Sequence, residues 1–374
     1  MTRALAARIP AKSGQALVLL GVRRCGKSIL QGQLMRRKPA FYCNLEDTRL
    51  FGLGPEDLPT LLGVIEELAG EAAIFLDEVQ EVSEWQRLVR SLMDRGRTLC
   101  VTGSNASLLG RELGAKLTGR HRSFEVFPFS FPEYLAGTGR KAGAAALGAY
   151  LDDGGFPGYL RERDPQMLQE LLRDIVQRDI AQRHHLRETR HVMNLALFLL
   201  ANTGQPLSLH GLTKALAIPT VGQTSRYLEF LQDAYLLCAV PKFSASFKQR
   251  VVAPNKYYAI DNGLRRANSP QASPDIGHRL ENAVYLALRQ KGGAVCYAGE
   301  KGLWECDFVT DNLAIQVCAE LTPFNRSREI EGVSQALALP GKRQGIILTR
   351  DQRDRLTVGG KQIEVLPAWE WLAV

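Results

Sequence analysis

The sequence predicts an α/β protein whose first part is built on a parallel sheet. Short apolar runs of strand length recur there, segments with helical spacing separate them, and several runs end in glycine, small polar or acidic residues. Alternating strands and helices are typical of parallel sheets, because each parallel connection needs a crossover of a dozen or more residues. The strands are expected near residues 15–20, 40–45, 72–77, 98–103 and 122–127.

The composition is that of a globular protein with room for a large core. The chain has 374 residues, of which 45% are hydrophobic and 23% charged, and this length suggests two or three domains. Its seven cysteines form no C-x-x-C pair, which argues against a zinc site or a disulfide framework. The sequence has no signal-like segment and no apolar run of about 20 residues, so we expect a soluble cytoplasmic protein.

The first apolar run leads directly into Gly21-Val-Arg-Arg-Cys-Gly-Lys-Ser28 and then into helix-forming residues. Strand, loop and helix together match the G-x-x-x-x-G-K-[ST] phosphate-binding loop, or P-loop. Its glycines let backbone N–H groups face phosphate oxygens, and the helix N-terminus adds a partial positive charge. Lys27 is expected to reach the β- and γ-phosphates of ATP, and the Ser28 hydroxyl to ligate Mg²⁺. The other residues expected around the phosphates are Gly21, Arg23, Arg24, Cys25, Gly26 and Ile29.

Polar side chains follow two later strands of the predicted sheet. The strand at 72–77 ends in Asp77-Glu78, where Asp77 fits the magnesium-side acid and Glu78 the general base that polarises water. The strand at 98–103 ends in Ser104 and Asn105, and the carboxyl ends of parallel strands face a bound ligand. These two residues are candidates to orient the water or contact the γ-phosphate. Alternatively, they cap a helix at residues 106–109.

Arg120 is the candidate for an arginine supplied to a neighbouring subunit, where it would stabilise charge on the transferred phosphoryl group. Arg122 is the second choice, and an ordinary solvated arginine is the alternative reading.

Taken together, these motifs resemble a known group. The phosphate loop, Leu-Asp-Glu-Val-Gln, Thr-Gly-Ser, Gly-Arg, Phe-Pro-Phe-Ser-Phe-Pro-Glu-Tyr and Gly154-Gly-Phe-Pro-Gly158 are similar to those of bacterial and archaeal AAA-type P-loop ATPases that carry a C-terminal domain of unknown function. The similarity runs from about residue 15 to the end of the chain. It implies ATP and Mg²⁺ as cofactors and a restriction-endonuclease-like C-terminal fold.

The middle of the chain predicts a winged helix-turn-helix. A charged helix is expected over 168–190, and three helices follow near 191–202, 208–217 and 220–231, with Ser208 as a cap. A strand at 235–240 and a hairpin-like stretch at 242–258 complete the pattern. Three helices followed by a hairpin is the order of a winged helix, whose third helix can enter the DNA major groove.

Charge supports DNA as the partner of this segment. The chain carries a net charge of +8, and residues 205–268 hold eight Lys or Arg against three acids. The alternative is a lid that senses nucleotide and contacts no DNA. The candidate DNA contacts are Thr220, Gln223, Thr224 and Arg226 on the third helix, and Lys242, Lys248 and Arg250 on the wing.

The C-terminal segment predicts a helix, three strands, a helix and a strand, the core order of restriction-endonuclease-like folds. Asp307 and Glu281 fit magnesium-binding carboxylates there, but the expected Glu-x-Lys reads Gln316-Val-Cys318. An amide is a poor magnesium ligand and a thiol offers no ammonium, so we expect no nuclease activity.

These predictions define four domains: an AAA-type ATPase core at 1–150, a helical lid or connector at 151–204, a winged helix-turn-helix at 205–268, and a restriction-endonuclease-like domain at 269–374. The leading functional hypothesis is a DNA-associated ATP-hydrolysing motor or remodeller, acting on duplex or branched DNA in recombination or repair. Its subunits would form a homo-oligomeric ring, most simply a hexamer. The rival is an ATP-dependent conformational switch with a protein partner on the C-terminal domain. We expect no membrane partner.

Overall fold

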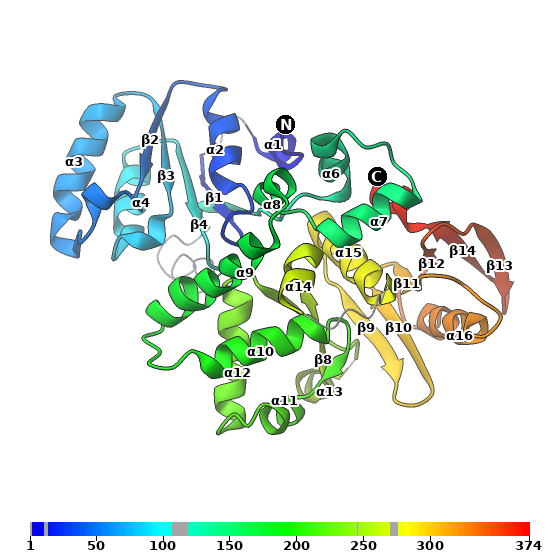
Figure 1. Cartoon of the computed structure of the whole chain (residues 1–374). Coiled ribbons are helices and arrows are strands. Elements are labelled where there is room, and N and C mark those ends of the chain that lie inside the picture. The colour runs from blue at the N-terminus through cyan, green and yellow to red at the C-terminus, as the bar shows by residue number, and fades with distance from the viewer. Residues whose placement is uncertain (1, 11–13, 107–118, 245, 270–275) are drawn as a thin grey trace. The chain divides into compact units, whose positions relative to one another are not determined.

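The structure is a computed structural model that describes residues 2–10, 14–106, 119–244, 246–269 and 276–374 (Figure 1). The chain divides into two compact units. The first contains residues 1–127 and 233–235, and the second contains residues 128–232 and 236–374.

The first unit is built on a five-stranded parallel sheet in the order β2-β3-β4-β1-β5. This confirms the predicted parallel sheet, because each expected strand is present within one residue or two of its predicted limits. Strands β1, β3 and β4 are buried along their whole length, as their unbroken apolar sequences require. The strands are β1 (Ala16–Leu20), β2 (Ala40–Asn44), β3 (Ala73–Asp77), β4 (Leu99–Gly103) and β5 (His121–Glu125).

In the part of this unit that the structure describes, helices lie beside the strands. Helix α2 contacts β3 and β4, α3 contacts β2, and α4 contacts β4. The apolar residues of α3 and α4 recur at helical spacing, which gives each helix one buried face. The helices are α1 (Leu5–Arg8), α2 (Lys27–Met35), α3 (Leu58–Ala69) and α4 (Trp85–Asp94).

The second unit begins with a run of helices: α6 (Phe131–Thr138), α7 (Ala144–Asp153), α8 (Pro157–Glu162) and α9 (Pro165–Asp174). A π-helical segment, Ile175–Gln182, continues α9. The expected single helix over 168–190 is therefore wrong at its C-terminal end. The backbone leaves the helix at His185, whose φ of 52° lies in the left-handed region, and a separate helix starts at Arg190.

A three-stranded antiparallel sheet in the order β6-β8-β7 lies next in the chain, together with the helices α10 to α13. The Ser208 hydroxyl caps α11 by accepting from the Gly211 N–H at 3.1 Å. The sequence did not predict β6, and the expected hairpin bend contains the helix α13 instead of a simple turn. The elements are α10 (Arg190–Ala201), β6 (Pro206–Leu207), α11 (Leu209–Ala215), α12 (Val221–Asp233), β7 (Leu237–Val240), α13 (Phe247–Val252) and β8 (Asn255–Ala259).

The end of the chain forms a six-stranded mixed sheet in the order β13-β14-β12-β11-β10-β9. The predicted helix, three strands, helix and strand are all present, and the hairpin of β13 and β14 is an addition that the sequence did not predict. The elements are α14 (Asn262–Asn268), α15 (Ile276–Lys291), β9 (Cys296–Glu300), β10 (Trp304–Val309), β11 (Leu313–Val317), α16 (Arg326–Leu337), β12 (Gln344–Thr349), β13 (Asp354–Val358), β14 (Lys361–Pro367) and α17 (Ala368–Leu372).

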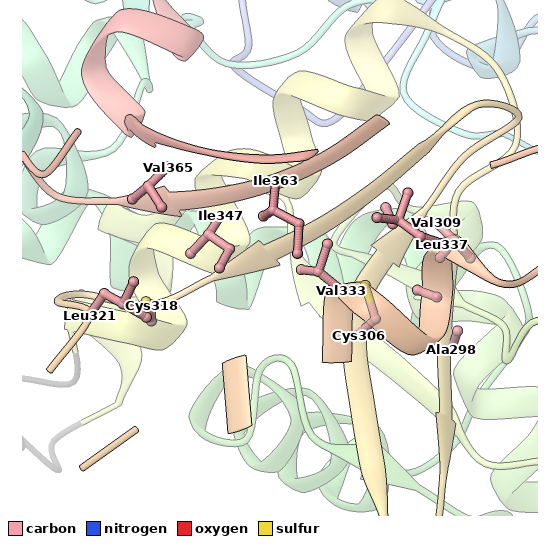
Figure 2. Close-up of a cluster of buried hydrophobic side chains, with 12 residues drawn as sticks. Ala298, Cys306, Val309, Cys318, Leu321, Val333, Leu337, Ile347, Ile363 and Val365 are labelled. Carbon is pink, nitrogen blue, oxygen red and sulfur yellow. The ribbon is translucent and has the colours of Figure 1, made fainter. Parts of the chain in front are cut away.

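Helix α16 packs on β10, β11 and β12, and the core of this sheet lies between them (Figure 2). Val333 and Leu337 from α16 meet Ile347 and Ile363 from the strands, and all four are buried. Cys306 and Cys318 belong to the same core, and all seven cysteines are free thiols. Nowhere in the described ranges does a helix combine the length and apolarity that crossing a membrane would require.

Gly155 illustrates how close backbone approach fixes the Gly-Gly-Phe-Pro-Gly segment. Its carbonyl accepts from the Phe129 N–H at 2.7 Å, and its N–H donates to the Asp261 carboxylate at 2.6 Å. A Cβ atom at position 155 would overlap the Phe129 backbone. We therefore expect Gly155→Ala to destabilise the second unit by about 2–3 kcal/mol.

The urea midpoint of tryptophan fluorescence measures this effect, because three of the four tryptophans lie in the second unit. Gly148→Ala is the matched control. Gly148 lies inside α7 with no atom near its notional Cβ, so its replacement should leave the midpoint unchanged or raise it. Equal midpoints for the wild type and Gly155→Ala would contradict the argument.

Candidate nucleotide site

The phosphate loop lies at the carboxyl edge of the first unit's sheet, between β1 and α2. Gly26 has a φ of 100° and stands directly before the first residue of α2, so a left-handed residue makes the turn into the helix. A Cβ atom on Gly21 would overlap the Val126 carbonyl, which explains the glycine at the start of the loop. The first N–H groups of α2 have no partner within the helix and form a site for phosphate oxygens.

The Lys27 ammonium is buried in this loop. Its Nζ donates to the Gly21 carbonyl at 3.1 Å and the Val22 carbonyl at 3.4 Å, and it lies 3.4 Å from Glu78 Oε1. The structure therefore brings the predicted phosphate-binding lysine and the predicted general base together.

The two acids of the second motif are held through the neighbouring strands. Asp77 ends β3, and its carboxylate accepts from the Thr102 hydroxyl of β4 and from the Tyr42 hydroxyl of β2, the latter at 2.9 Å. The same Thr102 oxygen accepts from the Glu78 N–H at 2.9 Å. Burial, followed by the hydrogen bond to Asp77, raises the pKa of Tyr42, so this hydroxyl remains a donor. Glu78 has a φ of 50°, and this left-handed backbone turns its side chain toward Lys27.

Ser104 and Asn105 follow β4 and are both buried. Gln80 connects Ser104 with Glu78, the predicted general base: its Nε2 donates to Glu78 Oε2 at 2.6 Å and to Ser104 Oγ at 3.4 Å. The alternative reading as caps of a helix at 106–109 extends into residues 107–109, which lie outside the described residues.

The remaining predicted phosphate-loop residues have varied surroundings. Arg23 is paired with Glu46 at 3.2 Å, while the Cys25 thiol donates to the Val126 carbonyl at 3.2 Å. Burial raises the pKa of this thiol. The side chains exposed to solvent at the loop and the first turn of α2 are Arg24, Ser28 and Ile29.

These groups fit magnesium and ATP. The loop offers a buried ammonium, helix N–H groups and a hydroxyl, and Asp77 adds a carboxylate. The described ranges hold no cluster of three His, Cys, Asp or Glu suited to a metal ion. Magnesium would therefore be coordinated by Ser28, Asp77 and the phosphates of the nucleotide. Few protein ligands together with substrate phosphates are usual for this ion.

Tyr42, Thr102 and Gln80 were missed by sequence reasoning. Thr102 has the clearest signal, because it lies within the predicted strand two residues before Ser104. Gln80 also has a local signal, since it ends the Leu-Asp-Glu-Val-Gln motif two residues after Glu78. Tyr42 has none, because only the folded sheet brings it to Asp77.

Arg120 lies at the amino-terminal end of the parallel strands, opposite the end that carries the phosphate loop. Its backbone carbonyl accepts from the N–H of Ala16, the first residue of β1, whereas the phosphate loop follows the last. Its guanidinium pairs with Asp94 at 2.5 Å and is half exposed. Arg122 is also exposed and stacks over Phe124 at 5.3 Å. Neither arginine is near the phosphate loop of its own chain.

The predicted DNA-contacting residues divide into two groups. Thr220 and Arg226 are exposed around α12 and Gln223 is half-buried, while Lys248 and Arg250 are exposed on α13. Thr224 is fully buried and shares a 2.8 Å hydrogen bond with Thr213, so its expected exposure is wrong. Its position on α12 places it on the apolar face with Tyr227, Leu228 and Leu231.

Lys242 is also less accessible than expected. It is half-buried and pairs with Tyr297 of β9 in a parallel bridge. The basic residues of this stretch therefore do not lie together at the bend of a hairpin.

The carboxylates of the C-terminal segment surround a lysine. Lys256 Nζ from β8 lies 3.0 Å from Asp307, 3.2 Å from Glu281 and 2.8 Å from Glu305. Burial alone would lower the pKa of Lys256, but the three carboxylates raise it well above its usual value. Lys256 was counted among the basic residues favouring DNA, and the structure corrects this because the side chain is buried in the acidic cluster.

Gln316 and Cys318 lie beside this cluster. Gln316 accepts from the Asp307 N–H at 3.2 Å and donates to Glu329 at 2.8 Å, so its amide is used in structural hydrogen bonds. Cys318 is part of the buried core.

Two segments of the chain match known domain families. A model of the AAA domain matches residues 13–135, and a domain of unknown function (DUF8612) matches residues 145–275. A Walker-type ATPase of Pyrococcus abyssi has a TM-score of 0.43 and 18% identity, covering 67% of this chain and 90% of that one.

Two relatives match along nearly the whole chain. An uncharacterized protein of Haemophilus influenzae is 29% identical over 95% of this chain and 93% of its own length. An uncharacterized protein of Methanocaldococcus jannaschii is 31% identical over 95% of this chain and 87% of its own length. The chain therefore belongs to the same family as the Methanocaldococcus jannaschii protein, and its first unit is an AAA-type P-loop ATPase domain.

Proposed function

We propose that the protein binds and hydrolyses ATP with magnesium. The observation that carries this proposal is the meeting of Lys27 and Glu78 at the edge of one sheet, with their charged atoms 3.4 Å apart and Asp77 fixed beside them. A buried ammonium next to a carboxylate at the end of a phosphate loop is suited to phosphoryl transfer to water.

Each residue has a separate task in this reaction. Lys27 and the loop N–H groups would hold the phosphates, and Ser28 and Asp77 would hold magnesium, which neutralises phosphate charge when bound. Glu78 accepts a proton from the attacking water. Gln80 would orient the Glu78 carboxylate, and Ser104 or Asn105 would orient the water or contact the γ-phosphate.

We further propose that hydrolysis drives work on DNA. Residues 205–268 would form a winged helix-turn-helix, since β6, α11, α12 and the antiparallel strands β7 and β8 follow one another there, with α13 between the last two strands. The exposed Arg226, Lys248 and Arg250 are available for phosphate contacts. Residues 1–150 would be the ATPase core, 151–204 a lid, and 269–374 a restriction-endonuclease-like domain without nuclease activity. Arg120 would complete the site of the next subunit in a ring, most simply a hexamer.

Steady-state ATP hydrolysis with and without duplex or branched DNA tests both the ATPase activity and its coupling to DNA. We expect DNA to raise turnover severalfold, and this stimulation to fall as salt rises. Lys248→Ala/Arg250→Ala should remove most of the stimulation and lower the slope of log affinity against log salt by about 2. The matched control is Lys301→Ala/Lys361→Ala, which removes two other exposed lysines.

A conformational switch with a protein partner is the second candidate. The burial of Thr224 and Lys256 favours it, because two groups counted for DNA binding are used inside the protein. A switch should hydrolyse ATP slowly and at the same rate with every DNA tested. That result, with no DNA binding at low salt, would contradict the motor and leave the ATPase proposal intact.

A further inference from the structure

Arg3 is a buried arginine close to the phosphate loop that the proposed reaction does not yet use. It precedes α1 and is only 4% exposed. Its Nη1 donates to the Cys25 carbonyl at 2.6 Å, and its Nη2 donates to the Phe127 carbonyl at 2.7 Å. These charge-assisted hydrogen bonds connect the start of the chain to the loop and to the segment after β5.

The Cys25 carbonyl belongs to the peptide bond that joins Cys25 to Gly26. In a planar trans peptide the C=O and N–H groups point in opposite directions. By holding this carbonyl, Arg3 turns the Gly26 N–H away from itself, toward the opposite side of the loop. A notional Cβ on Gly26 would lie 3.0 Å from Arg3 Nη1, so the guanidinium packs directly against the loop at this residue.

The segment that carries Arg3 is attached to the helix that follows the loop. The Arg3 N–H donates to Gln33 Oε1 of α2 at 2.9 Å. Arg37, just after α2, donates to the Ala6 carbonyl at 2.7 Å and the Ile9 carbonyl at 3.3 Å. Arg3 is thus fixed relative to the loop that it contacts and to the helix that follows the loop.

We propose that Arg3 is a positioning residue for nucleotide phosphates. This role of Arg3 rests on the proposed ATP-binding function and adds to it. Arg3 holds the Cys25–Gly26 peptide in the orientation that presents an N–H to phosphate, and it places a fixed positive charge behind the loop. The nucleotide site of this protein therefore includes the N-terminal segment ahead of the first strand.

Binding of a fluorescent ATP analogue with magnesium to the full chain tests this role. Arg3→Ala should weaken binding about 10- to 100-fold, because a charge-assisted hydrogen bond and the peptide orientation are lost. The nucleotide affinity of Arg3→Lys should lie between that of Arg3→Ala and that of the wild type, since an ammonium lacks the guanidinium fork that spans two carbonyls. The KM for ATP should rise with the dissociation constant, while kcat changes less.

Two matched variants separate positioning from stability. Arg37→Ala loosens the same segment without removing the guanidinium at Cys25, so it should lower the unfolding midpoint and leave nucleotide affinity near wild type. Arg8→Ala removes an exposed arginine of α1 and should change neither.

Three results would overturn the inference. Wild-type nucleotide affinity in Arg3→Ala and Arg3→Lys would reject the role of Arg3 and would not affect the proposed ATPase function. An equal loss of affinity in Arg37→Ala and Arg3→Ala would reduce Arg3 to a structural anchor. A wild-type chain that binds no more nucleotide than Lys27→Ala would reject this inference and the proposed function together.

Discussion

Glu78→Gln is expected to lower ATP turnover about 100- to 10,000-fold, the range that a general base contributes. The amide has nearly the same shape as the carboxylate and can still accept a hydrogen bond from Lys27, which lies 3.4 Å away. It cannot take a proton from water at neutral pH. ATP affinity should therefore stay near that of the wild type, and the variant should accumulate in an ATP-bound form.

Single-turnover hydrolysis beside equilibrium nucleotide binding measures both quantities. Glu81→Gln is the matched control, because Glu81 ends the short helical turn Val79–Glu81 that directly follows Glu78 and its side chain is exposed. Normal hydrolysis by Glu78→Gln would show that the assignment of the base is wrong.

Lys256→Ala is expected to destabilise the second unit by about 3–5 kcal/mol. Its ammonium lies among three carboxylates, and Glu281 and Asp307 are buried. Without the lysine, two buried acids face each other with no positive charge between them. Burial and the Asp307 charge already raise the pKa of Glu281, so removing Lys256 should raise it further.

The urea midpoint of tryptophan fluorescence again reports this change, since Trp304 begins the strand that carries Glu305 and Asp307. Lys248→Ala removes an exposed lysine and should change stability by less than about 0.5 kcal/mol. Lys256→Met/Glu281→Gln/Asp307→Asn, which leaves no buried charge from these three residues, should recover much of the loss. An unchanged midpoint in Lys256→Ala would mean that the cluster contributes little to stability.

The sheet and the phosphate loop could be predicted because their signals are local. Five apolar runs with fixed lengths, and a glycine-lysine-serine spacing after the first of them, are visible in short windows of sequence. Ser208 was recognised as a helix cap for the same reason, because a cap depends on the residues that follow it.

Other features depend on contacts between distant parts of the chain. Arg3 and Phe127 are 124 positions apart, and Lys256 and Asp307 are 51 apart. No window of sequence contains both partners, so charge counting treated Lys256 as a free cation. Thr224 differs from these cases, since its spacing from Tyr227, Leu228 and Leu231 already marks it as part of the apolar face of its helix.

The location of Arg120 has a consequence for how copies of this chain can associate. The phosphate loop and Arg120 lie at opposite edges of one parallel sheet, separated by the five residues of β1, a length of about 17 Å. If Arg120 of one subunit completes the site of a neighbour, the amino-terminal end of the strands in the first subunit must face the carboxyl-terminal end of the strands in the neighbour. Such a contact joins two different surfaces. A two-fold symmetric pair satisfies it only if both reciprocal contacts form at once, and otherwise the contact continues head to tail from copy to copy. Each added copy would repeat the same rotation, and only the size of that rotation decides whether the assembly closes on itself or continues as a filament.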